Sequence, residues 1–426
     1  MNWRWYLFWL KDILTGANIY KAYNDIKKSY YKGNLDLQED IENLLKHATD
    51  TTKYYKKYKG KNIKDFPVIN KAIIKENFEK IQSELYKGKD LHKMSTSGST
   101  GTPLTVVQDK RKRARVIASV IFFGKLCGYK FGERQMFLRV WVDRIKKSKL
   151  QKFLQNMIPE DVSNLSNEKI EEVINVLKND KKVKNVLSYA STLEKITNYL
   201  EGKDEKIYGL NSIISGSELL QENVRRRLKE IFNCNVVSRY ANEENGILGQ
   251  DCIENNHEIH LNIADYYFEF LKLDEDIPAK EGELSRIVIT DLWNYALPLI
   301  RYDTCDLAII GKADCKDKQG VVIKEIYGRK VDLIYNTQGN PVSPHLITNN
   351  MWGIEGVKQF KFIQENQSVF KILLNLENKA NFNERDLIDR FKKLLGRDAE
   401  IKIEFTNEIP VLNSGKRKYI ENLFRK

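Results

Sequence analysis

The 426-residue chain is long enough to bury a large core in two or three domains. Hydrophobic residues make up 42% of the chain and charged residues 30%, which is typical of a soluble globular protein. The net charge is +13, and the basic residues are spread along the sequence. Such an excess of positive charge could attract nucleotides, nucleic acid or anionic lipid, but it does not indicate a fold. The number of cysteines, five, is odd and does not suggest a framework of disulfides. We therefore expect the protein to be located in the reducing cytoplasm.

The first residues read Met-Asn-Trp-Arg-Trp-Tyr-Leu-Phe-Trp-Leu-Lys. Arg4 and Lys11 interrupt this apolar run, which is too short to span a bilayer. Three tryptophans in nine residues suit a membrane interface, so peripheral membrane contact through this aromatic N-terminus is one interpretation. The alternative, which we favour, is a first helix packed against the body of a cytoplasmic protein.

Residues 17–90 read as helical and strongly basic, with Tyr54, Tyr55 and Tyr58 among lysines. Such a mixture can bind single-stranded nucleic acid. More often lysine stems cover aromatic rings on a solvated helix face, and we expect no nucleic-acid partner. Farther on, Asn70 is a candidate N-cap of a helix.

Residues 95–103, Ser-Thr-Ser-Gly-Ser-Thr-Gly-Thr-Pro, combine hydroxyl side chains with Gly98 and Gly101 and contain no carboxylate. Glycine allows close approach of the main chain, and successive N–H groups can form an anion-binding concavity. The segment predicts a phosphate-binding loop, although it lacks the G-x-x-x-x-G-K-[ST] pattern of nucleotide triphosphatases. The alternative is a flexible surface linker.

From residue 110 to 235, predicted helices alternate with short apolar strands. We expect strands at 185–189, 212–214 and 236–238, which makes this an α/β protein with a parallel sheet. Two helices are expected between them, one opened by the capping-box spacing of Ser191 and Glu194 and one from Glu218 to about Phe232. Ligands of such sheets bind at the carboxyl ends of strands, which directs attention to loops 215–218 and 240–246.

Residues 257–290 alternate apolar and polar side chains, which predicts an antiparallel or barrel-like portion. Beyond Gly328 we expect a small α+β domain of strands and one amphipathic helix closed by Gly396. The apolar face of that helix is formed by Leu387, Ile388, Phe391, Leu394 and Leu395.

Six segments together carry a family resemblance. They are the hydroxyl-rich loop, Gly216-Ser-Glu218, Tyr240-Ala-Asn-Glu-Glu-Asn-Gly246, Pro298-Leu-Ile-Arg-Tyr-Asp-Thr-Cys-Asp306, and the pair Gly328-Arg-Lys-Val-Asp332 and Asn413-Ser-Gly-Lys416. In this order they resemble the adenylate-forming superfamily of acyl-CoA synthetases, in its branch of phenylacetate–CoA ligase-like and capsular polysaccharide CapK proteins. The resemblance covers nearly the whole chain. It implies a large N-terminal adenylate-forming domain over residues 1–327 and a mobile α+β lid domain over residues 328–426.

The resemblance also implies roles for individual residues. The loop residues would hold the β- and γ-phosphates of ATP; they are Ser97, Gly98, Ser99, Thr100, Gly101 and Thr102. Ser217 and Glu218 would line the adenine and Tyr240 would stack on it. Glu244 would bind Mg²⁺.

Three further roles follow from the same resemblance. Asp306 would accept hydrogen bonds from the ribose hydroxyls, because a carboxylate offers two acceptor oxygens to a diol. Arg329 would lie near ribose and phosphate. Lys416 would be the catalytic lysine that offsets charge on the phosphoryl oxygens.

The sequence departs from the family pattern at three places. Cys305 replaces a glycine, and Glu243 replaces the threonine that precedes Glu244, so two acids stand side by side. The usual hinge aspartate falls at Val331, with Asp332 following it.

Relatives of this branch often carry zinc ligands, and here Cys252, His260 (or His257) and Cys315 fall at comparable positions. Their sulfur and nitrogen atoms would suit Zn²⁺, but a fourth ligand is not evident. Scattered structural cysteines are the alternative.

The resemblance therefore implies an AMP-forming acid–thiol ligase that uses ATP and Mg²⁺ to make an acyl-adenylate from a small carboxylate. The acyl group would pass to CoA or, in cell-envelope polysaccharide biosynthesis, to a sugar or amine. A non-catalytic nucleotide-binding member of the fold is the alternative. No residue identifies the acid; Phe122, Phe123, Tyr129 and Trp141 fit an aromatic pocket and a core equally well.

Overall fold

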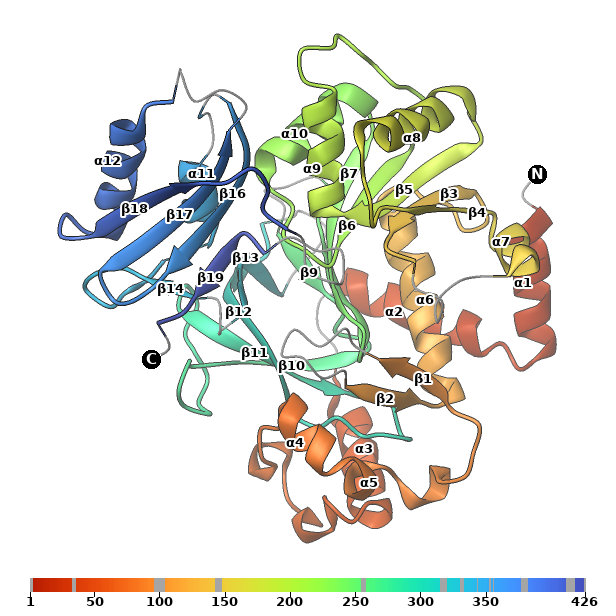
Figure 1. Cartoon of the computed structure of the whole chain (residues 1–426). Coiled ribbons are helices and arrows are strands. Elements are labelled where there is room, and N and C mark those ends of the chain that lie inside the picture. The colour runs from red at the N-terminus through yellow and green to blue at the C-terminus, as the bar shows by residue number, and fades with distance from the viewer. Residues whose placement is uncertain are drawn as a thin grey trace. The chain divides into compact units, whose positions relative to one another are not determined.

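The structure is a computed structural model of the whole chain (Figure 1). It describes residues 3–32, 36–95, 104–141, 148–253, 258–314, 320–329, 333–342, 344–351, 354, 356–376, 382–410 and 418–424. The chain divides into two compact units, one made of Met1–Thr304 with Ile309–Glu325 and the other of Cys305–Ala308 with Ile326–Lys426. The predicted domain boundary between residues 327 and 328 remains a prediction.

The N-terminal part of the first unit is helical, as predicted. Its helices are α1 (Trp3–Leu14), α2 (Asn18–Lys32), α3 (Gln38–Thr51), α4 (Lys71–Glu76) and α5 (Phe78–Ile81), with 3-10 turns at Lys56–Tyr58, Ile63–Asp65 and Glu84–Tyr86. The predicted N-cap is confirmed, because the Asn70 side chain accepts the N–H of Ile73 at 3.0 Å. Tyr55 is fully buried, and the Tyr58 ring stacks on Phe66. These two rings of the basic stretch therefore serve packing.

The hydroxyl-rich loop connects the two strands of a hairpin, β1 (His92–Ser95) and β2 (Thr105–Gln108). Ser95 pairs with Thr105, and their hydroxyl oxygens lie 2.9 Å apart. The residues that flank the loop are thus held together by an antiparallel ladder. Residues 96–103 themselves lie outside the described part of the chain.

The main sheet contains eleven strands within the described residues, in the order β10-β11-β12-β13-β9-β8-β7-β6-β5-β3-β4. The strands are β3 (Arg134–Arg139), β4 (Met157–Asp161), β5 (Val183–Tyr189), β6 (Ser212–Gly216), β7 (Asn235–Asn242), β8 (Gly246–Asp251), β9 (Ile259–Leu261), β10 (Tyr266–Leu271), β11 (Leu284–Asp291), β12 (Tyr302–Lys312) and β13 (Val321–Arg329). From β4 to β7 the neighbours are parallel, whereas β8 pairs antiparallel with both β7 and β9. The predicted α/β class and parallel sheet are confirmed, and the alternating segment after residue 257 continues the same sheet.

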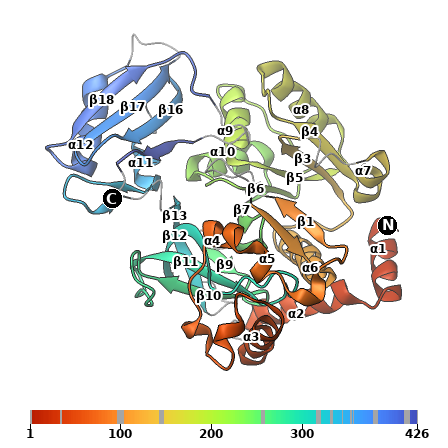
Figure 2. The same cartoon turned by 60° about the horizontal axis from the view of Figure 1, so that its bottom comes forward.

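Helices α6 (Lys110–Leu126), α7 (Lys149–Gln155), α8 (Asn167–Asn179), α9 (Ala190–Tyr199) and α10 (Glu222–Phe232) accompany these strands (Figures 1 and 2). Helices α9 and α10 pack on the parallel strands, and α6 packs on α2 and β8. The predicted capping box at Ser191 was wrong, because α9 already begins at Ala190. The helix expected from Glu218 begins four residues later, at Glu222.

The second unit has its own core. Its elements are β14 (Ile334–Tyr335), β15 (Pro341–Val342), α11 (Pro344–Asn350), β16 (Val357–Gln364), β17 (Val369–Leu376), α12 (Glu384–Leu395), β18 (Glu400–Phe405) and β19 (Ile420–Asn422). The four-stranded sheet has the order β18-β17-β16-β19, and α12 buries Leu387, Phe391 and Leu395. The predicted α+β domain is therefore present. Gly396 follows α12 with a φ of +128°, a conformation that glycine adopts without strain.

Candidate active site

Two neighbouring parallel strands bring the predicted nucleotide-binding segments together. Gly216, the last residue of β6, pairs with Arg239 of β7. Ser217 and Glu218 follow the first strand directly, and Tyr240 follows Arg239 on the second. Because both strands run the same way, these residues share one sheet edge, the edge where α/β proteins bind ligands.

Glu244 lies in the turn between β7 and β8 and is buried, whereas its neighbour Glu243 is exposed. The Lys71 Nζ atom lies 2.7 Å from Glu244 Oε1, and the Tyr302 hydroxyl donates to the same oxygen at 3.0 Å. The Gln108 side chain also donates to the Glu244 backbone oxygen at 3.1 Å. Two segments far apart in sequence therefore meet at this carboxylate, and a third holds the Glu244 backbone. Burial and a cationic partner distinguish Glu244 from Glu243.

A buried ion pair supports the same turn. Lys112 on α6 and Asp291 at the end of β11 are inaccessible to solvent, with Nζ and Oδ2 2.7 Å apart. Lys112 also donates to the Tyr266 hydroxyl at 3.0 Å, and that hydroxyl donates to the Asn245 backbone oxygen at 2.6 Å. The Asn245 amide donates to Asp291 Oδ2 at 3.4 Å. This network ties the residue after Glu244 to α6 and β11.

The network has electrostatic consequences. Burial raises the pKa of Asp291, although the Lys112 ammonium opposes the shift. Burial also raises the pKa of the Tyr266 phenol well above its ordinary value. Our sequence reasoning missed Lys112 and Asp291. No local sequence pattern marks them, since only half of the other residues of α6 are buried.

Glu218 has a structural partner of its own, and Ser217 marks a sharp turn before it. Ser217 has a φ of +69°, the left-handed region, so the chain turns sharply as it leaves β6. Glu218 Oε2 accepts the N–H of Ser191 at 2.8 Å, one of the free N–H groups in the first turn of α9. Glu218 thus fixes the 215–218 loop to that helix. Its predicted place beside adenine remains a prediction.

Tyr240 reaches toward the start of β12, because its hydroxyl donates to Thr304 Oγ1 at 3.4 Å. Thr304 in turn donates to the Ile287 backbone oxygen at 2.9 Å. The next residue, Cys305, has a φ of +64°. This conformation favours glycine, which explains in physical terms why the resembling family has glycine there. Asp306 follows on the same strand and is half-buried.

The remaining predicted site residues are Arg329, the phosphate-loop residues and Lys416. Arg329 is half-buried at the end of β13. The phosphate-loop residues Ser97 to Thr102 lie outside the described residues, and so does Lys416. Their predicted roles remain predictions.

The zinc prediction gains no support. Cys252 and His260 are buried on neighbouring segments, since Gln250 of β8 pairs with His260 of β9. Among the described residues, no group of three His, Cys, Asp or Glu side chains could hold a metal ion, and Cys315 is outside them.

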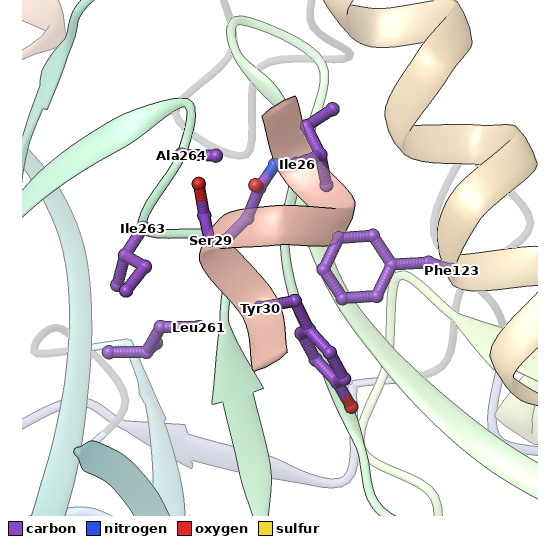
Figure 3. A pocket seen from close by; sticks show the side chains of 8 residues that line it. Ile26, Ser29, Tyr30, Phe123, Leu261, Ile263 and Ala264 are labelled. Carbon is purple, nitrogen blue, oxygen red and sulfur yellow. The ribbon is translucent and has the colours of Figure 1, made fainter. Parts of the chain in front are cut away.

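A small hollow between α2 and the β9 turn does not belong to this site (Figure 3). Its lining is mostly apolar and includes Ile26, Tyr30, Phe123 and Leu261, and it leaves no space for a water molecule. Phe122 and Phe123, which we considered for a substrate pocket, pack in the core against α2. The hollow is therefore a packing gap.

Comparisons with known proteins agree with this fold. The family model described as the CapK C-terminal domain matches residues 334–423. A search of curated proteins finds no match to the sequence. Among solved structures, 2-hydroxyisobutyryl-CoA ligase in the postadenylation state with 2-HIB-AMP has a TM-score of 0.71 at 12% identity, covering 91% of this chain and 88% of its own.

A second solved structure shares the fold over part of its length. ATP-bound MatB from Rhodopseudomonas palustris has a TM-score of 0.57 at 13% identity, covering 76% of this chain and 65% of its own. At such identities the likeness concerns the fold. The chain therefore has the fold of adenylate-forming ligases, and its residues 334–423 match the CapK C-terminal domain family.

Proposed function

We propose that the protein activates a carboxylic acid with ATP. A carboxylate oxygen attacks the α-phosphorus, the bond to the bridging oxygen of the β-phosphate breaks, and an acyl-adenylate and pyrophosphate result. In a second step a nucleophile attacks the acyl carbon and AMP leaves. The observation that carries this proposal is Glu244, a buried carboxylate with a cationic partner, at the strand edge of an adenylate-forming fold.

The residues fit the groups that such a reaction needs. A carboxylate and phosphate oxygens are the hard ligands that Mg²⁺ prefers, and Glu244 would supply the protein ligand. Magnesium would neutralise charge on the phosphates. Tyr240 would offer its ring to adenine and Asp306 its oxygens to the ribose, with Ser217, Glu218 and Arg329 lining the nucleotide.

Lys416 would deliver a positive charge to the phosphoryl oxygens in the transition state, where it lowers the barrier most. The hydroxyl-rich loop would bind the departing phosphates. The hairpin that pairs Ser95 with Thr105 supports this role, because it holds the residues flanking the loop together.

For the acceptor we favour CoA, because the structurally similar 2-hydroxyisobutyryl-CoA ligase is described in complex with 2-HIB-AMP and CoA. A sugar or amine in capsular polysaccharide biosynthesis is the second candidate, favoured by the CapK C-terminal domain. No helix within the described residues has the length and apolar character needed to cross a membrane. We propose a cytoplasmic location.

The test is a hydroxylamine-trapping screen of carboxylic acids with ATP and Mg²⁺, in which pyrophosphate release is measured. We expect one class of acids to give acid-dependent release, and Glu244→Gln and Lys416→Ala to reduce it by about a hundredfold or more. A Lys418→Ala variant serves as the matched control for loss of a nearby lysine. Undiminished release by Lys416→Ala would contradict the catalytic proposal. ATP binding without release for any acid would favour the non-catalytic alternative.

A further inference from the structure

Helix α1 presents an apolar face to solvent. Only Trp9 and Asp12 of this helix are buried. The Trp9 ring packs edge-on against Tyr20 and Tyr23, and Asp12 accepts the N–H groups of Ile19 and Tyr20 at the start of α2. The helix nevertheless exposes seven large apolar side chains: Trp3, Trp5, Tyr6, Leu7, Leu10, Ile13 and Leu14. A surface helix of a soluble protein normally turns polar residues outward, so this arrangement requires an explanation.

Helix α7 extends the same apolar surface. Arg4 Nε donates to the Phe153 backbone oxygen at 3.1 Å, and the Trp3 and Phe153 rings lie 6.1 Å apart. Figures 1 and 2 both show α1 and α7 side by side. Leu150, Phe153 and Leu154 of α7 are exposed as well. We call the exposed side chains of these two helices the α1–α7 surface. It holds ten of the twenty exposed large apolar side chains found in the described chain.

The charges on this surface are all positive. Arg4 and Lys11 lie on α1, and Lys149 and Lys152 lie on α7. The one acid in the two helices is Asp12, which is buried and bound to the backbone of α2. Tryptophan and long basic side chains beside exposed aliphatic residues are typical of helices that lie in the headgroup region of a membrane.

We propose that the α1–α7 surface binds the face of an anionic lipid bilayer. The apolar side chains insert at the level of the headgroups, while the basic side chains pair with lipid phosphates. A second copy of the chain is a poorer occupant, because a symmetric contact would bring the same four positive charges against each other. The proposal does not depend on the catalytic one, since no proposed site residue lies on α1 or α7.

The full chain is tested by co-sedimentation with vesicles of phosphatidylglycerol and phosphatidylcholine in equal parts, and with phosphatidylcholine alone. We expect binding to the mixed vesicles, weaker binding to the neutral ones, and a decrease as salt is raised. Each Lys or Arg near an anionic surface strengthens binding by about fivefold, so Lys149→Glu with Lys152→Glu should lower the partition coefficient by at least tenfold.

A matched pair of triple variants isolates the surface. Leu7→Gln, Leu10→Gln and Ile13→Gln change side chains that are 55%, 53% and 58% exposed. The control, Leu85→Gln, Ile277→Gln and Val321→Gln, changes side chains elsewhere that are 58%, 44% and 50% exposed. We expect the first variant to lose vesicle binding by at least tenfold and the control to keep it, with circular dichroism unchanged in both.

Two results would overturn the proposal. One is a wild-type chain that stays in the supernatant with anionic vesicles. The other is equal vesicle binding by the two triple variants. If sedimentation velocity shows a wild-type dimer that the α1 variant dissociates, while vesicles bind neither protein, the occupant is a second copy and the membrane assignment is wrong.

Discussion

The buried pair of Lys112 and Asp291 leads to the most specific prediction. Both side chains are inaccessible to solvent and the charged atoms are 2.7 Å apart. Removing one partner of such a pair leaves the other charge buried without compensation, which costs about 3–5 kcal/mol. We therefore expect Lys112→Met to lower the free energy of unfolding by about that amount. The measurement is urea-induced unfolding followed by tryptophan fluorescence.

A double-mutant cycle tests the electrostatic origin of this cost. Replacing both partners with apolar residues, as in Lys112→Met with Asp291→Leu, removes the uncompensated charge along with the pair. The double variant should then be about 1–3 kcal/mol more stable than the sum of the two single changes predicts. Additive effects would refute the reasoning, because they would mean that each side chain contributes only by its own packing.

The same pair should influence the proposed chemistry. Asp291 accepts the Asn245 amide, and Lys112 holds the hydroxyl that donates to the Asn245 backbone, so the network positions the turn that carries Glu244. Loss of groups that support a metal ligand typically costs about 10–100-fold in metal affinity or activity. Asp291→Asn, which keeps the shape of the side chain, should raise the KM for MgATP by about tenfold. An unchanged KM in a folded variant would show that the pair serves stability alone.

Three further outcomes follow from single residues. Lys71→Met should lower the rate of pyrophosphate exchange by about tenfold, because it deprives buried Glu244 of its charge partner. Lys71→Arg keeps the positive charge and should retain most of the activity. Equal exchange rates for the two variants would contradict this. Cys305→Gly should raise the midpoint temperature of thermal unfolding, since it relieves left-handed backbone strain of about 1 kcal/mol. A lowered midpoint would mean that the packing of the thiol stabilises the fold by more than this strain costs. Burial raises the pKa of Asp251 from 3.8 to about 6 despite its ion pair with Arg225. Because the folded-state pKa is the higher one, the protonated side chain stabilises the fold below about pH 4, and this contribution of up to about 3 kcal/mol is lost as the pH rises to about 6. Urea unfolding of wild type and Asp251→Asn across that range should show the difference, and parallel curves would refute it.

Several features were predictable because they depend on local patterns. The apolar runs that became β5, β6 and β7 lie between helical periodicities, so a parallel sheet and its ligand edge could be expected. Asn70 was recognised as an N-cap because capping needs only a side chain and the first turn after it. The apolar face of α12 was visible in the spacing of Leu387, Phe391 and Leu395.

Other features depended on neighbours that the local pattern does not reveal. Ser191 and Glu194 had the spacing of a capping box, yet Glu218 from another loop binds the N–H of Ser191. Nothing beside Lys112 in the sequence points to its partner, because Asp291 lies at the end of β11. On α1, the sequence favoured packing against the body, but the structure buries only one narrow face of the helix.

The sequence alone determined the class of the fold and the order of motifs that resembles the adenylate-forming superfamily, and it predicted a strand edge for a ligand. These follow from periodicity and from chemistry within a few residues of each other along the chain. Only the tertiary structure decided that Lys71 and Tyr302 meet at Glu244 and that Glu243 points to solvent. It also decided that α7 joins α1 in one exposed apolar surface. Such pairings depend on how distant segments pack, and one segment's sequence does not specify which distant side chain will fill the space beside it.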